Sequence, residues 1–334
     1  MADVCQQLGQ PAYRASQLWN WLYVAQCTDW SEMKNLPAAL RADMGARFAL
    51  PSAVPIHTEG PAAATRKILV QLHDGEAIEE VLIPAAERRT VCVSSQAGCR
   101  YRCAFCASGQ AGFRRQLEAG EMVGQVLVAA RAYGERPTHV VFMGIGEPFD
   151  NYDNVLKAIR IINDPDGLGI GARRITVSTC GLIPGIQRLA RESLQIELSV
   201  SLHAPTDDLR AQLMPVNRKF PLKNLLAACK AYSAATGRII TFEYTLIHGV
   251  NDTPGHAREL TRLLSSLPCR VNLIPLSQVE EFRGEPSSPE TARMFIDVLD
   301  KAGINATLRA SKGGSLKAAC GQLRYGRSER EQPS

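Results

Sequence analysis

The sequence contains no long apolar segment and no strong excess of charge. No apolar run reaches the roughly 18 residues that a membrane-spanning helix needs, so no contact with a membrane is expected. The N-terminal stretch lacks the basic start, apolar middle and small-residue cleavage site of a secretory signal, which favours a cytoplasmic protein. The formal charge of +5 is compatible with an anionic partner but does not require one.

The amino-acid composition is that of an ordinary globular protein, except that it contains many cysteines. Hydrophobic residues make up 45% of 334 residues, which suits one large α/β domain with a small appendage. Because a cytosolic protein is not expected to form a disulfide framework, grouped cysteines indicate metal ligands or reactive thiols. Four of the ten cysteines stand apart and are expected to be packing residues: Cys5, Cys27, Cys229 and Cys269.

Basic residues gather at two places. One group flanks three closely spaced cysteines: Arg100, Arg102, Arg114 and Arg115. The other lies near the C-terminus: Arg309, Lys312, Lys317, Arg324 and Arg327. Each group is expected to be a solvated face, unless both border one site, in which case they would suit nucleic-acid phosphates.

The pattern of apolar residues divides the chain into four parts, which we expect at 1–50, 51–90, 91–310 and 311–334. Helical spacing over 15–22 and 36–48 predicts a helical N-terminal domain. The proline-rich stretch 51–61 is expected to be a linker. Alternation over 67–84 around Asp74-Gly75 predicts a β-hairpin.

From residue 91 onward, strands and helices alternate. The expected strands are 91–95, 139–143, 175–178, 197–202, 240–246 and 271–274, and the expected helices are 120–133, 152–163, 222–235, 254–266 and 289–302. Short apolar strands joined by helices are typical of parallel sheets, and six of them predict an α/β fold with a partial (βα)6 barrel. In such folds the chemistry lies at the carboxyl ends of the strands, and the polar motifs here do follow the strands.

Three cysteines follow the first of these strands, as Cys99-x-x-x-Cys103-x-x-Cys106. Three thiolates can hold three irons of a [4Fe–4S] cluster and leave the fourth iron open, as a catalytic metal centre requires. The alternative is a structural zinc with Cys92 as fourth ligand. Zinc loops usually pair two Cys-x-x-Cys units or add histidines, and none lies near, so the cluster is favoured.

This motif, with Phe105 before its last cysteine, resembles the signature of the radical S-adenosylmethionine (SAM) superfamily. Further segments resemble a narrower family, the radical SAM methyltransferases of 23S rRNA adenine (RlmN/Cfr type). They are Cys92-Val-Ser-Ser-Gln-Ala-Gly-Cys99, Met143-Gly-Ile-Gly146-Glu147-Pro148, Ser201-Leu202-His203-Ala204-Pro205, Asn272-Leu-Ile-Pro and Ala318-Ala-Cys320-Gly-Gln-Leu323. The likeness runs in order from Gly9 to Leu323, and it implies a [4Fe–4S] cluster and SAM as cofactors.

The resemblance also implies the course of the reaction. Cys320 matches the cysteine that first accepts a methyl group from SAM. A second SAM, cleaved at the cluster, supplies the radical that takes hydrogen from this methyl group, and the carbon radical adds to adenine. Cys92 matches the cysteine that helps to remove the ring proton and forms a disulfide with Cys320 as the product leaves.

Several residues at strand ends match the family's SAM contacts. Gly146 and Glu147 match the turn that binds the methionine amino group, where a carboxylate suits a cation. The other matches are Ser178, Ser201, Leu202, His203 and Asn272. Any one of them alone would be consistent with a polar residue of the core, but five at one barrel face favour a site.

Each reactive residue also has a structural alternative. The glycines around Cys320 suit a mobile loop and its basic neighbours would favour a thiolate; the alternative is an inert thiol. For Cys92, on an apolar strand, the alternative is packing. Glu79 matches a carboxylate proposed as proton acceptor in the family, although beside Glu80 it has the pattern of a solvated strand end.

The N-terminal fifty residues resemble the accessory RNA-binding domain of the family. Arg14, Trp19, Trp21 and Tyr23 are candidates for RNA contact, although core packing is favoured for the tryptophans. The chain departs from the family at two places. Ser315 stands near where carbon-2 enzymes usually carry an acidic residue, and Cys180 stands where serine is common.

These observations favour methylation of carbon 2 of an adenine in 23S rRNA, with tRNA as a further candidate substrate. The alternatives are carbon-8 methylation, as in relatives that confer antibiotic resistance; a radical SAM reaction on a non-RNA substrate; and a non-catalytic RNA-binding protein with a structural metal. The separated pair Cys92 and Cys320 argues against a non-RNA substrate. We expect a monomer served by a cellular electron donor such as flavodoxin.

Overall fold

The computed structural model of the protein describes residues 1–50, 52–309 and 316–324. Its strands are β1 Ala53–Glu59, β2 Arg66–Leu72, β3 Ala77–Ala85, β4 Arg88–Cys92, β5 Gln96–Gly98, β6 Phe113–Gln116, β7 His139–Phe142, β8 Ile175–Thr179, β9 Glu197–Ser201, β10 Ile240–Leu246, β11 Cys269–Pro275 and β12 Asn305–Leu308. Ten of them form one sheet in the order β1-β2-β3-β4-β7-β8-β9-β10-β11-β12, and β5 pairs with β6.

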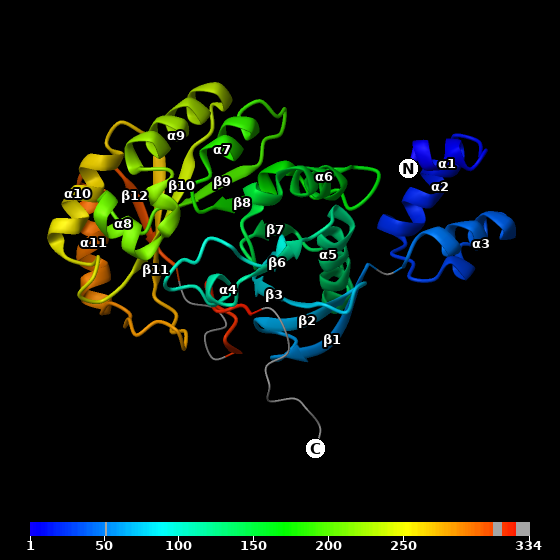
Figure 1. Ribbon diagram of the computed structural model, residues 1–334, viewed down its shortest axis with the longest axis horizontal. Coiled ribbons are helices and arrows are strands. Elements are labelled where there is room, and N and C mark those ends of the chain that lie inside the picture. The colour runs from blue at the N-terminus through cyan, green and yellow to red at the C-terminus, as the bar shows by residue number, and fades with distance from the viewer. Residues whose placement is uncertain (51, 310–315, 325–334) are drawn as a thin grey trace, which may run out of the picture.

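The helices of residues 1–50 are α1 Ala2–Gln7, α2 Tyr13–Trp19 and α3 Ala38–Arg47; those that follow are α4 Ala107–Gln110, α5 Ala119–Tyr133, α6 Tyr152–Asn163, α7 Ile183–Leu189, α8 Asp207–Leu213, α9 Leu222–Thr236, α10 Pro254–Leu264 and α11 Pro289–Lys301. Helices α5, α6, α9, α10 and α11 lie outside the curved sheet (Figure 1). In α6, Val155, Ile159 and Ile162 are buried at helical spacing, so one face of the helix packs on the strands. No helix of the described residues has the length and apolarity to cross a membrane.

The parallel part of the sheet confirms the predicted α/β fold. Strands β4, β7, β8, β9, β10, β11 and β12 pair in parallel, while β1 to β4 pair in antiparallel fashion. The sheet is not closed, because β1 and β12 are its edges in the part of the chain that the structure describes. The partial barrel therefore has the six predicted strands and a seventh, β12, whose half-exposed residues gave no apolar signal.

One expectation for this region is wrong. The stretch 51–61 is not a linker, because residues 53–59 form β1. This strand lies at the edge of the sheet, and its register with β2 shifts between Pro55 and His57. An edge strand with an irregularity accommodates a proline, which lacks the N–H that a central strand needs. Proline and small residues therefore did not exclude a strand here.

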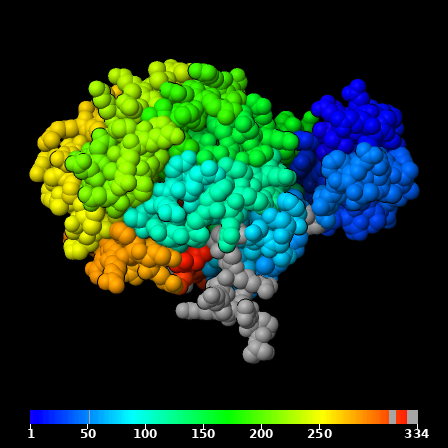
Figure 2. All heavy atoms as spheres, viewed as in Figure 1, coloured from blue at the N-terminus to red at the C-terminus, as the bar shows by residue number. Residues whose placement is uncertain are grey.

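Residues 1–50 form a lobe with a hydrophobic cluster of its own (Figure 2). The buried members are Cys5, Leu18, Met33, Leu36, Leu40 and Met44. Trp19 lies edge-on to Tyr23, with ring centroids 4.5 Å apart, and also lies against Gly167 of the barrel. Trp21 packs on the lobe's cluster and donates to Asn35 Oδ1 at 2.5 Å. Both tryptophans thus have the packing role that the sequence favoured.

Candidate active site

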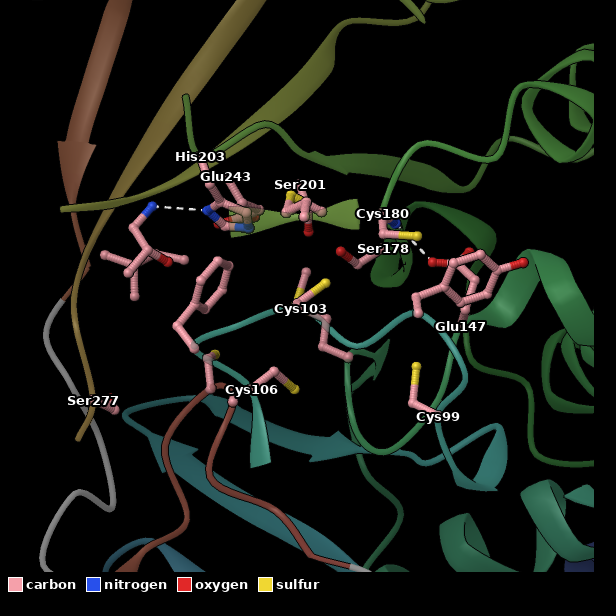
Figure 3. A pocket seen from close by; sticks show the side chains of 18 of the residues that line it. Cys99, Cys103, Cys106, Glu147, Ser178, Cys180, Ser201, His203, Glu243 and Ser277 are labelled. Atoms are coloured by element: carbon pink, nitrogen blue, oxygen red, sulfur yellow. Dashed lines mark hydrogen bonds between the residues drawn. The ribbon is translucent and has the colours of Figure 1, made fainter. Parts of the chain in front are cut away.

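The three cysteines of the motif lie in the loop between β5 and α4. The paired strands β5 and β6 hold the loop at its base, where the Cys99 N–H donates to the carbonyl of Gly112 at 2.8 Å. Gly98 has φ +75°, and a Cβ there would lie 1.9 Å from the same carbonyl, so only glycine fits. The side chains of Cys99, Cys103 and Cys106 line one cavity at the carboxyl ends of the parallel strands (Figure 3).

The spacing of these thiols favours the cluster over the zinc. A tetrahedral zinc with four thiolates places its sulfurs about 3.8 Å apart, since each Zn–S bond is about 2.3 Å. Among the described residues, the three cysteines do not form a set whose ligand atoms all lie within 4.8 Å of one another. A wider spacing fits ligands that bind three different irons of a cluster. Cys92, the fourth ligand of the zinc hypothesis, does not line the same cavity.

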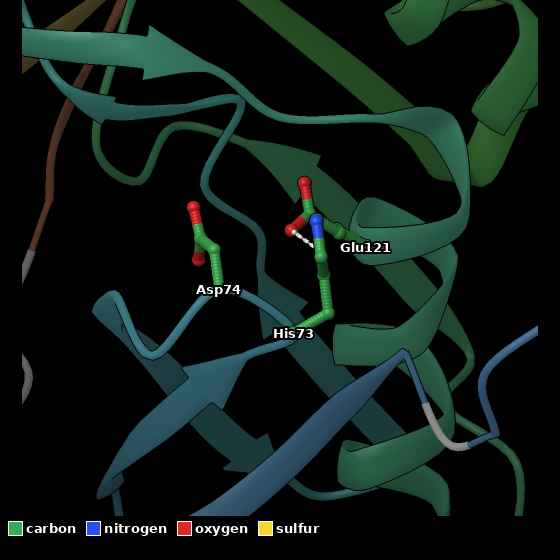
Figure 4. Close-up of side chains that lie close together, drawn as sticks. All are labelled: His73, Asp74 and Glu121. Carbon is green, nitrogen blue, oxygen red and sulfur yellow. Dashed lines mark hydrogen bonds and ion pairs between the residues drawn. The ribbon is translucent and has the colours of Figure 1, made fainter.

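A different set of residues has its potential ligand atoms close enough together for one metal ion. His73, Asp74 and Glu121 have ligand atoms within 4.8 Å of one another (Figure 4). Arg115 already fills this position with a positive charge, since it bonds Asp74 at 2.6 Å and both carboxylate oxygens of Glu121 at 2.7 and 2.8 Å. The group therefore ties the β2–β3 turn to α5, and Arg115 is not free to contact a phosphate.

Glu147 lies in the turn after β7 and joins three strand ends. Its Oε1 accepts the N–H of Phe149 at 3.0 Å, and its Oε2 accepts the N–H of Cys180 at 2.7 Å. Its own N–H donates to Gln96 at 2.8 Å. Gly146 has φ +105°, and a Cβ there would meet Gln96 at 2.6 Å, so glycine is required. Burial raises the pKa of Glu147, while the two N–H donors favour its charge.

His203 supports the cysteine loop from the end of β9. Its Nδ1 accepts the N–H of Thr245 at 2.9 Å, and burial lowers its pKa to about 3, so the ring is neutral. Its ring meets Phe105 edge to face, with centroids 4.9 Å apart. His203 therefore supports the side chain of Phe105, the residue that precedes the last cysteine of the motif.

Two cavities meet inside the barrel. The first cavity holds the motif cysteines together with Gly146, Glu147, Ser178, Ser201 and His203. The second cavity holds Cys92 and Asn272. Cys320 lines both. Leu202 lines neither, and its side chain is fully buried in the core. The structure thus gathers most of the predicted residues, but Asn272 faces the second cavity rather than the first.

The segment that carries Cys320 is docked on the cysteine loop. The N–H of Ala107 donates to the carbonyl of Gly321 at 2.7 Å, and Ser108 Oγ donates to the carbonyl of Leu323 at 2.6 Å. Residues about 215 positions apart in the sequence are therefore in direct contact. Residues 310–315, with Lys312 and Ser315, and Arg327 lie outside the described residues.

Cys92 and Cys320 are both free thiols, as are all ten cysteines, so the expected disulfide between them is not formed in this structure. Burial, followed by the neighbouring Cys320, raises the pKa of Cys92 to about 12. Cys320 is accessible through the cavity, yet desolvation raises its pKa as well, and Arg309 lowers it only in part. The basic neighbour Arg309 therefore favours the thiolate, as expected, but desolvation of the thiol outweighs it in the docked state.

Glu79 lies apart from both cavities. Its Oε1 pairs with Lys67 at 3.0 Å, and its Oε2 accepts the backbone N–H of Arg324 at 2.8 Å. It therefore contacts the same C-terminal segment that carries Cys320. The idea of a solvated strand end is wrong, because the side chain of Glu79 is 14% exposed and Glu80 is fully buried.

Most of the basic residues in the two sequence groups are paired within the protein. Arg100 pairs with Asp150 at 3.0 Å, Lys317 with Glu280 at 3.1 Å, and Arg324 with Glu281 through two bonds of 2.7 and 3.0 Å. Arg309 pairs with Glu243 at 3.9 Å, and it differs from the others because it lines both cavities. Among the described members of the two groups, Arg309 is the one that lines the two cavities, while Arg100, Lys317 and Arg324 are held in ion pairs.

Comparison with known proteins agrees with this geometry. Residues 93–260 match the radical SAM superfamily, and residues 1–50 match the ribosomal RNA large subunit methyltransferase N-terminal domain. A crystal structure of a radical SAM methyltransferase from Sphaerobacter thermophilus is 47% identical, with a TM-score of 0.93; the match covers 97% of this chain and 96% of that one.

Curated relatives agree over the same length. A probable dual-specificity RNA methyltransferase RlmN of Symbiobacterium thermophilum is 47% identical over 97% of this chain and 88% of the relative. One of the same description from Dictyoglomus thermophilum is 46% identical over 96% of this chain and 93% of the relative. This chain belongs to the RlmN family of radical SAM RNA methyltransferases. As a member of that family it is an enzyme, and the non-catalytic interpretation is wrong.

Arg210 is a residue of this RlmN-family site that the sequence did not reveal. It is fully buried and donates to the carbonyls of Leu202, Cys180 and Ser201 at 3.1, 2.8 and 3.0 Å, and to Asn217 at 2.9 Å. Its guanidinium thereby joins the ends of β8 and β9. No local pattern points to it, because its partners are mostly backbone carbonyls.

We predict that Arg210→Met destabilises the fold by on the order of 3–5 kcal/mol, because buried carbonyls lose their donors. Chemical denaturation measures the change, and iron content after anaerobic reconstitution is expected to fall with it. Arg160→Met is the control, since this side chain is 61% exposed and its pair with Glu192 is worth less than about 1 kcal/mol. If the free energy of unfolding falls as little in Arg210→Met as in the control, the hydrogen bonds of Arg210 do not stabilise the fold.

The family resemblance implies that Cys320 accepts a methyl group from SAM, and we predict that this transfer accelerates steadily with pH. A thiolate is the nucleophile, and the Cys320 pKa lies above its ordinary value, so the reactive fraction grows about tenfold per pH unit from pH 7 to 9. Single-turnover mass spectrometry of the Cys320 peptide at saturating SAM measures the rate. Arg309→Met is expected to slow it at every pH, and a plateau below pH 8 in the unaltered enzyme would contradict the account.

Proposed function

We propose that this enzyme methylates carbon 2 of an adenine in 23S rRNA, and in tRNA as well, through an S-methylcysteine at Cys320. The observation that carries the proposal is the position of Cys320 in the wall between two cavities. One contains the three motif cysteines and the other contains Cys92. The dual-specificity RNA methyltransferase names of the relatives support two RNA substrates.

The first cavity suits the cofactors that the family implies. Cys99, Cys103 and Cys106 line it and would hold a [4Fe–4S] cluster, one cysteine to each of three irons. Glu147, Ser178 and Ser201 line the same cavity and would bind SAM, with the Glu147 carboxylate near the methionine amino group. Bound together, the cluster and SAM supply the radical chemistry.

The second half of the reaction would use the two separated thiols. Cys320 accepts a methyl group by displacement, and after loss of one hydrogen its carbon bonds to the base. The radical adduct would then lose one electron, for which the cluster that cleaved SAM is the acceptor, and the ring proton, which Cys92 helps to remove. The sulfur of Cys92 then bonds to the sulfur of Cys320 as the carbon–sulfur bond breaks, and the carbon keeps the electron pair and gains a proton.

Two further roles complete the proposal. Glu79 is proposed as a proton acceptor that becomes available when the C-terminal segment withdraws the Arg324 N–H from it. Residues 1–50 are proposed as an accessory RNA-binding domain, which the match to a ribosomal RNA methyltransferase N-terminal domain supports. The enzyme is proposed to work in the cytoplasm as a monomer, with reduction by a donor such as flavodoxin.

The test is anaerobic reconstitution followed by incubation with SAM, a reductant and either a 23S rRNA fragment or tRNA. Mass spectrometry of the digested RNA is expected to show 2-methyladenosine from both substrates and none with Cys320→Ala. Cys269→Ala, at the opposite end of a strand from the site, is the control and keeps its activity. Detection of 8-methyladenosine would move the enzyme to the carbon-8 type, and no modified base would refute RNA methylation.

We predict that Cys92→Ala accumulates a covalent protein–RNA adduct. Without this thiol the ring proton is not removed and the bond to Cys320 does not break. Denaturing gel electrophoresis after reaction with labelled RNA detects the adduct, and nuclease digestion with mass spectrometry locates it on the Cys320 peptide. Free methylated RNA at the normal rate from this variant would disprove the role of Cys92.

A further inference from the structure

We infer that the second cavity is the site of the target base, and that the free carboxylate oxygen of Glu243 accepts a hydrogen bond from the exocyclic amino group of adenine. The inference rests on the proposed RNA methylation and adds how the base is recognised. Glu243 lies in β10 and belongs to none of the motifs that carry the family resemblance.

The division of residues between the cavities places the base. Cys99 and Cys103 line only the first cavity, and Cys92 lines only the second. Cys320 and Glu243 line both. A ring that receives carbon from Cys320 and gives a proton to Cys92 must be within reach of both thiols. Only the second cavity satisfies this condition.

The hydrogen bonds of Glu243 leave one oxygen without a donor. The side chain is buried, with the residue 4% exposed. Its Oε1 accepts from Ser199 Oγ at 3.2 Å and from Asn272 Nδ2 at 3.1 Å. Its Oε2 forms an ion pair with Arg309, whose Nη1 lies 3.9 Å away, but at that distance it has no hydrogen-bond partner. Because buried polar atoms are nearly always satisfied, this oxygen is expected to meet a donor on a ligand.

Adenine carries the donor that this oxygen lacks. An ionised carboxylate only accepts hydrogen bonds, and the adenine amino group offers two N–H donors. Guanine and hypoxanthine present a carbonyl oxygen at the same ring position, which would face the carboxylate without a proton between them. A site built to bind an N–H group rejects analogues that lack it far more strongly than an apolar pocket does.

The competing ligand for the same oxygen is a ribose hydroxyl of SAM, because Glu243 also lines the first cavity. The two ligands are separable, since methylation of Cys320 needs SAM but no RNA. Loss of a contact to the base changes the preference between target bases and leaves the SAM dependence of Cys320 methylation unchanged. Loss of a contact to SAM raises the SAM concentration that half-saturates Cys320 methylation.

The test is Glu243→Gln, assayed on RNA with adenine or hypoxanthine at the target position. Ser199 and Asn272 both donate to Oε1, so the glutamine oxygen keeps that position and its NH2 group faces the cavity. We expect kcat/KM for adenine to fall ten- to a hundredfold and the preference for adenine over hypoxanthine to shrink at least tenfold. Glu192→Gln is the control, because Glu192 lines neither cavity and bonds Arg160 and Tyr152.

A second measurement needs no variant. Purine riboside at the target position keeps carbon 2 but lacks the amino group, and we expect the unaltered enzyme to process it ten- to a hundredfold more slowly than adenine. An unchanged adenine preference in Glu243→Gln, or equal rates with purine riboside, would overturn the inference. So would a raised half-saturating SAM concentration with an unchanged base preference. If the unaltered enzyme modifies no RNA, it is the proposed function that fails.

Discussion

Two hydrogen bonds to backbone carbonyls hold Cys320 beside the three-cysteine loop. Ala107 donates to Gly321 and Ser108 donates to Leu323, so both acceptors directly follow the thiol in the chain. Both donors belong to the first turn after Cys106, so the loop that would bind the cluster also positions the C-terminal segment. Without this contact Cys320 would not be held where it lines both cavities.

Burial and two arginines determine the protonation and charge of the groups in the site. Desolvation raises the pKa of Cys92 and Cys320, and Arg309, which faces both thiols, opposes it. Arg210 is a second buried cation, held by carbonyls at the ends of β8 and β9. The raised pKa values leave both thiols largely protonated in the docked state.

The sequence predicted the parallel strands because their apolar runs are short and continuous, as in residues 139–142. It did not predict β1, whose proline suggested a linker, or β12, which is a half-exposed edge. The cysteine motif was visible because its spacing is local. Glu243 and Arg210 were not, because a single polar residue in an apolar segment shows its role only when partners from other strands are known. Glu79 matches a carboxylate proposed as proton acceptor in the family, yet its contacts are with Lys67 and Arg324 rather than with the thiols.

The most direct measurement is an anaerobic crystal structure of the reconstituted enzyme with SAM. We expect a [4Fe–4S] cluster on Cys99, Cys103 and Cys106, SAM on the fourth iron, and the sulfur of Cys320 turned toward the cofactor from the wall between the cavities. A single tetrahedral zinc among these sulfurs would contradict the account. So would a cluster-bound enzyme in which Cys320 faces bulk solvent, away from both cavities.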